Sequence, residues 1–267
     1  MSVAGLPLVL ASVSAVAFTL FAVFFRRGWV PRGIWAPWPV VVLSGVVNFV
    51  AVLVWANAAD GLLTLSGLAF GLFAQYTVLA AASDAKGWLI AKEITWPPIV
   101  VGVSALVMFL AAVGPGVFPS TPGGWWFLAS AAVVVAALGL FFYGVPGLIA
   151  GVLGVWAGIL FLQAGLLGGV LLLLLAGLFS IRSGFGMGFG DVRMAGVAAA
   201  TLWWVPVDFV MVGFVLFAVS TLVWAALDDR KKVEGKSWIH RKVPLAPTFC
   251  VSMGLGALSF LALATLT

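Results

Sequence analysis

Apolar stretches long enough to cross a lipid bilayer make up most of this chain, and few charged residues interrupt them. The stretch 147–180, for example, contains no charged residue. A membrane-spanning helix needs about 20 mostly apolar residues, because the hydrocarbon core of a bilayer is about 30 Å thick. Of the 267 residues, 64% are hydrophobic and 8% are charged, which is too little charge to cover the surface of a soluble domain. The sequence therefore excludes an ordinary soluble enzyme and a disordered chain, and predicts an integral membrane protein.

The spacing of these stretches predicts an all-α, polytopic bundle of about ten helices (roughly eight to ten) in a single domain, 1–267. Between 144 and 182 the pattern allows either one long helix or two short ones broken near 163–165. No internal repeat and no soluble domain is evident. The expected helices lie near 4–25, 39–57, 62–82, 94–113, 125–143, 147–163, 165–181, 191–204, 208–227 and 245–265.

Positive charge predicts how the bundle is oriented, because Lys and Arg collect in cytoplasmic loops. With the first basic cluster, 26–32, in the cytoplasm, the N-terminus lies outside. Three crossings between 114 and 181 then bring all 13 Lys and Arg to the cytoplasmic side, whereas two crossings would divide them. Only Asp60 and Asp208 are left outside among the charged residues. A re-entrant segment within 144–165 is the alternative to a full set of three crossings.

Other residue types restrict the chemistry and the packing. Cys250 is the only cysteine and His240 the only histidine, so a disulfide, a CxxC pair and a multi-His metal site are all excluded. The 32 glycines predict close helix packing through small residues. The basic residues serve orientation, so we expect no nucleic-acid partner. Tryptophans near the predicted helix ends indicate an interfacial aromatic belt: Trp35, Trp38, Trp125, Trp126, Trp203 and Trp204.

Two aspartates are the candidates for chemistry. Asp84 follows the third predicted helix, and Asp191 follows the glycine-rich stretch 184–190. The predicted topology places both at the same cytoplasmic edge, where they can converge. Two carboxyl groups at hydrogen-bonding distance share a proton, so one can activate water while the other protonates a leaving amine. The alternative is that each aspartate only marks a helix end, with Asp84 beside Lys86 and Asp191 at a helix N-terminus.

The residues around these aspartates resemble the type IV prepilin peptidases, which include the archaeal preflagellin peptidases and are GxGD-type membrane aspartyl proteases. The resemblance covers roughly 62–113 and 165–265. The chain departs from the family pattern at Ala91, where the family has Pro, and at Ala246, where it has Gly. Three blocks carry the resemblance: Asp84, Lys86, Thr95 and Pro97; then Gly188-Phe189-Gly190-Asp191; then Pro244-Leu245-Ala246-Pro247.

The resemblance implies an endopeptidase that cleaves the leader of prepilin-, pseudopilin- or preflagellin-type precursors at the cytoplasmic edge of a prokaryotic cell membrane. Asp84 and Asp191 would be catalytic, with no metal and no cofactor. The segment 26–38 has no cysteine in place of the paired CxxC motifs of bifunctional members, so we expect no methyltransferase activity. The hairpin 125–163 has no counterpart in the family. The implied substrate-binding or site-shaping residues are Lys86, Thr95, Pro97, Gly188, Gly190, Arg193, Pro244 and Pro247.

A different class of function fits the same aspartates. Ionisable residues inside a helix bundle also bind protons or ions in transporters, and a non-catalytic assembly factor can retain them. Lys86 and Arg193 also have two interpretations. Each either stabilises the charge of a nearby carboxylate or only orients its helix. The sequence determines neither the individual substrate nor the oligomeric state.

Overall fold

The computed structural model describes residues 5–29, 34, 36–58, 64–87, 90–113, 189–227 and 245–266. All regular structure within these ranges is helical, and each α-helix overlaps a range predicted from the sequence. The helices predicted at 125–143, 147–163 and 165–181, and with them the hairpin 125–163, lie outside the described residues. The elements are α1 (Gly5–Trp29), α2 (Trp38–Ala58), α3 (Thr64–Gly87), the short 3-10 helix η3 (Lys92–Ile94), α4 (Trp96–Val113), α7 (Phe189–Thr201), α8 (Val207–Leu227) and α9 (Leu245–Leu266).

Four of the described helices are long and apolar enough to cross a membrane: Leu8–Trp29, Trp38–Ala58, Leu65–Ala85 and Ala246–Leu266. Two more, α4 and α8, contain shorter apolar segments. Their outward faces carry large exposed apolar side chains, including Val42 on α2 and Val215 on α8. Such faces are stable against lipid, because lipid chains are as apolar as the side chains themselves. The described part of the chain is therefore a helical membrane bundle.

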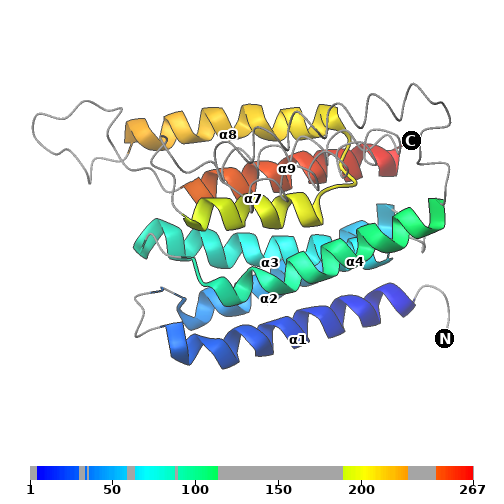
Figure 1. Ribbon diagram of the computed structural model, residues 1–267, viewed down its shortest axis with the longest axis horizontal. Coiled ribbons are helices and arrows are strands. Elements are labelled where there is room, and N and C mark those ends of the chain that lie inside the picture. Colours follow the sequence, from blue (N-terminus) through cyan, green and yellow to red (C-terminus); the bar gives the residue numbers. More distant parts are fainter. Residues whose placement is uncertain are drawn as a thin grey trace, which may run out of the picture.

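Helix α3 occupies the centre of the described bundle, with α1, α2, α4, α7 and α9 packed against it. Helix α8 packs against α9. The helices run side by side along the long axis of the molecule (Figure 1). A residue near either end of α3 therefore lies among several neighbouring helices.

The helix ends next to the predicted basic segments lie at one end of the bundle. Helix α1 ends and α2 begins there, α3 ends and α4 begins there, and α8 ends and α9 begins there (Figure 1, left). Helix α7 also begins at this end, whereas α4 ends at the opposite one. Helix α4 therefore ends at the bundle end opposite to the one where α7 begins. The number of crossings between these two helices stays a prediction. The placement of this end in the cytoplasm, and of the N-terminus outside, stays a prediction.

Glycines lie where helices approach most closely, as the sequence predicts. A Cβ atom built at Gly102 of α4 would overlap the Ala200 carbonyl group of α7. One built at Gly256 of α9 would lie 2.5 Å from the Phe209 carbonyl oxygen of α8. Backbone atoms cannot move aside as a flexible side chain can, so these two contacts need glycine.

A buried polar network joins α1, α2 and α3. The Ser14 hydroxyl donates to Asn48 Oδ1 at 3.0 Å, and Asn48 Nδ2 donates to Gln75 Oε1 at 2.8 Å. Gln75 Nε2 in turn donates to the Ser44 hydroxyl at 3.4 Å. All four side chains are buried. Because no water competes inside a membrane bundle, such bonds set the rotation of each helix relative to its neighbours.

Replacing Asn48 with Leu is expected to destabilise the protein. The substitution leaves the buried Ser14 hydroxyl without its acceptor and the buried Gln75 Oε1 without its donor. A buried polar group without a partner lowers the free energy of unfolding by about 1–3 kcal/mol. Thermal unfolding in detergent measures the loss, and Asn57→Leu is the matched control because Asn57 is exposed on the same helix. Equal unfolding temperatures for the two variants would contradict a stabilising role for the network.

Two tryptophans contradict the prediction that they belong to an interfacial aromatic belt. Trp203 and Trp204 are 1% and 8% exposed, so they belong to the protein interior rather than to a lipid interface. The ring of Trp204 lies 4.3 Å from that of Trp55, and the ring of Trp203 lies 5.2 Å from that of Phe109. Helix α7 ends early, at Thr201, and the following turn directs both rings inward. Trp38 is exposed as predicted, with the Arg26 guanidinium 4.7 Å from its ring centre.

Candidate functional site

Asp84 is the buried carboxylate of the described bundle. It lies near the end of α3, inside the apolar stretch Leu65–Ala85, and is 7% exposed. Its Oδ2 accepts a hydrogen bond from the backbone N–H of Ala246 at 3.0 Å. Burying a carboxylate in an apolar bundle is costly unless hydrogen bonds compensate, so this position is one that a membrane helix rarely retains without a role.

Asp84 binds the N-terminus of α9, and the residue before this helix in the sequence is a proline. The first N–H groups of a helix have no partner within the helix, and Ser, Thr, Asp or Asn usually supplies one. Here Pro244 precedes α9 and Pro247 stands in its first turn, and neither offers an acceptor. Asp84 supplies the acceptor from a helix 162 positions away in the sequence. The positive end of the α9 dipole further favours a negative charge there.

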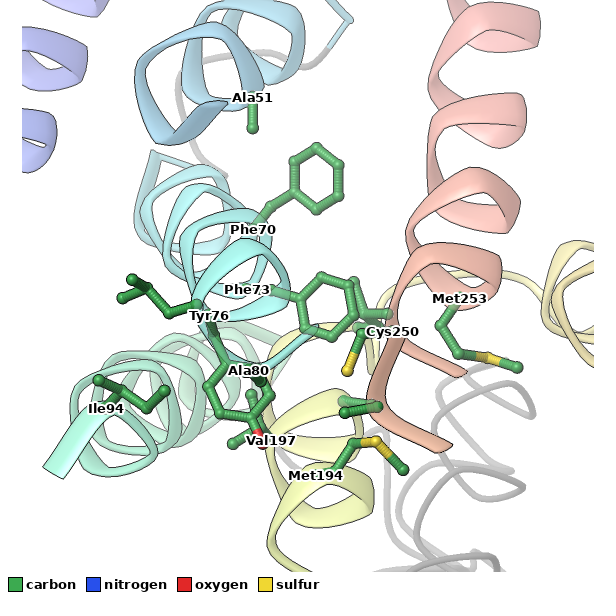
Figure 2. Close-up of a cluster of buried hydrophobic side chains, with 14 of the residues drawn as sticks. Ala51, Phe70, Phe73, Tyr76, Ala80, Ile94, Met194, Val197, Cys250 and Met253 are labelled. Carbon is green, nitrogen blue, oxygen red and sulfur yellow. The ribbon is translucent and has the colours of Figure 1, made fainter. Parts of the chain in front are cut away.

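Ser83 and Cys250 are two described residues with weakly polar side chains near this carboxylate. The Ser83 hydroxyl donates to the Leu79 carbonyl of its own helix at 2.7 Å. One turn into α9, Cys250 is fully buried, close to Thr77 and Asp84 of α3. Figure 2 shows Cys250 in one cluster with Ala80 of α3 and Met194 of α7. Three helices, α3, α7 and α9, therefore meet beside Asp84.

Asp191 is the third residue of α7. Helix α7 begins at the bundle end where α3 ends and α9 begins, and it packs against both (Figure 1). Met194, three residues after Asp191, is fully buried in the cluster of Figure 2. The side chain of Asp191 lies outside the described part of the structure. The backbone thus brings the two aspartates to one end of the bundle, and the distance between their carboxyl groups stays a prediction.

The other predicted site residues that the structure describes lie at the same end. Thr95 is 3% exposed between η3 and α4, and Pro97 is half-buried in the first turn of α4. Pro247 is half-buried in the first turn of α9. Lys86 lies in the last turn of α3, while Gly190 and Arg193 lie on α7, and the structure describes only their helical backbone. Gly188 and Pro244 lie outside the described residues.

Two groups at this site are not evident from sequence reasoning. The Ala246 N–H is a backbone donor, and only the lack of a capping residue before α9 signals its need for a partner. Glu93 lies in η3 and is half-buried, with one carboxylate oxygen fully covered. A third acid therefore lies on the segment that follows α3.

Within the described residues, no cluster of three or more His, Cys, Asp or Glu side chains is arranged to hold a metal ion. The chemistry that this part of the chain offers is that of a carboxylate with a fixed hydrogen-bond partner. No protein-family model, curated protein or solved structure matches the chain.

Proposed function

We propose that this protein is a membrane aspartyl endopeptidase in which Asp84 and Asp191 form the catalytic pair. The observation that carries the proposal is the placement of Asp84, buried at the end of a membrane-length helix and hydrogen-bonded to the start of α9. Support also comes from α7, whose first turn contains Asp191 and lies at the same end of the bundle. The three sequence blocks that resemble prepilin peptidases are those that contribute α3, α7 and α9.

The proposed reaction needs only the two carboxyl groups and water. One carboxylate removes a proton from water, and the resulting hydroxide attacks the peptide carbonyl carbon. The other carboxyl group gives its proton to the leaving amine, so the C–N bond breaks into a new carboxylate and a new N-terminal amine. Either aspartate can act as the base, because a coupled pair titrates jointly. The Ala246 N–H holds one oxygen of Asp84 while the proton moves.

The proposed substrates are prepilin-, pseudopilin- or preflagellin-type precursors. Each presents a short basic leader followed by an apolar helix, with the scissile bond between them. A pair of carboxyl groups at the membrane edge matches that boundary. The proposed location is the cytoplasmic membrane of a prokaryotic cell, with the site facing the cytoplasm. No metal, organic cofactor or methyl transfer is part of the proposed reaction.

The test is cleavage of a full-length precursor by the purified protein in lipid nanodiscs. We expect a shorter product whose new N-terminus lies at the junction of leader and apolar helix. The control is a precursor without its apolar helix, which tests whether the protein selects a membrane substrate. An intact precursor after prolonged incubation would contradict the proposal.

One observation favours a second function, that of a non-catalytic membrane assembly factor. The hydrogen bond from Ala246 to Asp84 is a bond that a purely structural carboxylate would also make. In that case Asp84 only caps α9, and an uncharged acceptor at position 84 would serve equally well. Substitution by Asn separates the two functions, because Asn accepts the same hydrogen bond but cannot take a proton.

A further inference from the structure

Arg26 lies at the edge of the membrane-length part of the bundle. The membrane-length segment of α1 ends at Trp29 and that of α2 begins at Trp38, and Arg26 is in the last turn of α1. Arg27, the next residue, is exposed. The phosphate groups of a bilayer lie just outside its hydrocarbon core, so an arginine side chain in this turn reaches their level.

Two contacts fix the guanidinium of Arg26. Its Nε donates a hydrogen bond to the Ala36 carbonyl at 2.7 Å, and its Cζ lies 4.7 Å from the centre of the Trp38 ring. The Ala36 carbonyl is itself held in place, because Ala36 is buried and the Ile34 N–H donates to the Trp29 carbonyl at 3.1 Å. The side chain is therefore ordered before any ligand arrives, which lowers the entropy cost of binding.

The terminal nitrogens of Arg26 carry donors that these contacts do not use. The hydrogen bond to Ala36 comes from Nε, and no carboxylate of the described residues pairs with the guanidinium. The two terminal nitrogens form a planar fork of N–H groups that matches two oxygens of one phosphate. A fixed positive charge with such a fork is therefore complementary to a phosphate anion.

Exposed apolar side chains beside this charge indicate that the anion belongs to a lipid. Trp38 is 51% exposed, and Val42, one helical turn further along α2 and so on the same face, is 56% exposed. On α1, Phe24 is 76% exposed. A lipid whose phosphate lies at Arg26 can place its acyl chains beside these side chains, whereas a free phosphate ion has no group to contact them.

We propose that Arg26 binds the phosphate group of an anionic phospholipid, with the Trp38 ring against the guanidinium and the acyl chains along the exposed faces of α1 and α2. An anionic headgroup fits better than a zwitterionic one, because the choline cation of phosphatidylcholine would be repelled by both Arg26 and the exposed Arg27. The inference does not depend on the function proposed for Asp84.

Native mass spectrometry tests the site, because it counts the lipids bound to each protein molecule. The purified protein in a neutral detergent is titrated with phosphatidylglycerol, with phosphatidylcholine, and with phosphatidylglycerol in the presence of inorganic phosphate. We expect phosphatidylglycerol to bind about 10-fold more tightly than phosphatidylcholine, and equimolar inorganic phosphate to leave it bound. Equal affinities for the two lipids, or displacement of the lipid by inorganic phosphate, would overturn the inference.

Arg26→Lys separates a shaped site from general positive charge. Lysine keeps the charge but lacks the planar fork, so we expect the affinity for phosphatidylglycerol to fall about 10-fold. Arg27→Lys is the matched control, since it makes the same exchange at the adjacent exposed position and should leave the affinity unchanged. An unchanged affinity in Arg26→Lys, or an equal loss in both variants, would show that the contacts of Arg26 only anchor the segment between α1 and α2.

Trp38→Leu tests the site without changing an arginine. Loss of the ring beside Arg26 removes the cation–π contact and is expected to weaken phosphatidylglycerol binding about 3-fold. Trp96→Leu is the control, because Trp96 is 62% exposed at the same end of the bundle, where α4 begins. Thermal unfolding without lipid measures whether each variant is folded. Equal affinities of Trp38→Leu and Trp96→Leu for phosphatidylglycerol would overturn the assignment of Trp38 to the site.

Discussion

Asp84→Asn is expected to abolish precursor cleavage while leaving the fold nearly as stable as the wild type. The amide oxygen of Asn still accepts the Ala246 N–H, but it cannot remove a proton from water. The loss of one member of an acid–base pair lowers the rate by about 10²–10⁴-fold. Initial rates on the full precursor, with thermal unfolding of the same samples, measure both effects.

Asp84→Ala completes this comparison. It lowers cleavage to the same extent, and it also leaves the Ala246 N–H buried without an acceptor, at about 1–3 kcal/mol of stability. Asp208→Asn is the control, because Asp208 is exposed and begins α8 at the opposite end of the bundle. Cleavage that persists in Asp84→Asn would leave Asp84 with only its capping role and contradict the catalytic pair.

Gly102→Ala is expected to cause a large loss of stability. The new methyl group would overlap the backbone carbonyl of Ala200, so α4 and α7 must move apart. Overpacking of this kind costs about 1–3 kcal/mol, and the cost lies at the upper end where the neighbour is backbone. Because α7 also carries Asp191, we expect cleavage to fall together with the unfolding temperature in detergent.

Gly196→Ala provides the matched control on α7. A Cβ at Gly196 meets no atom of the described residues within 4 Å. Alanine is a better helix former than glycine by roughly 0.5–1 kcal/mol, so this variant should be as stable as the wild type or more so. Equal destabilisation by the two substitutions would show that glycine flexibility, rather than the contact between α4 and α7, matters at position 102.

The helices that the structure describes could be predicted from the sequence because their signal is local. Runs of apolar residues placed α1, α2 and α9 within a few residues of their observed bounds. The same local reading placed Trp203 and Trp204 at a lipid interface, and it was wrong. Their burial depends on Trp55 and Phe109, which come from distant helices, and on the early end of α7.

At the candidate site, too, the local features could be predicted from the sequence and the contacts between distant helices could not. Asp84 stood out because a carboxylate next to an apolar stretch is costly, and the structure places it among the buried residues. Its partner did not stand out, because the donor is the backbone of Ala246 and any residue but proline offers the same N–H. The network of Ser14, Asn48 and Gln75 also needed three helices in register before its hydrogen bonds became evident.

The most direct test of the central claim is the mass of the precursor after incubation with wild-type protein and with Asp191→Asn in nanodiscs. The account predicts that the wild type releases the basic leader at its junction with the apolar helix. It predicts that Asp191→Asn, folded and with the wild-type unfolding temperature, leaves the precursor intact. Equal cleavage by both proteins, or an intact precursor with the wild type, would contradict the assignment of a catalytic aspartate pair.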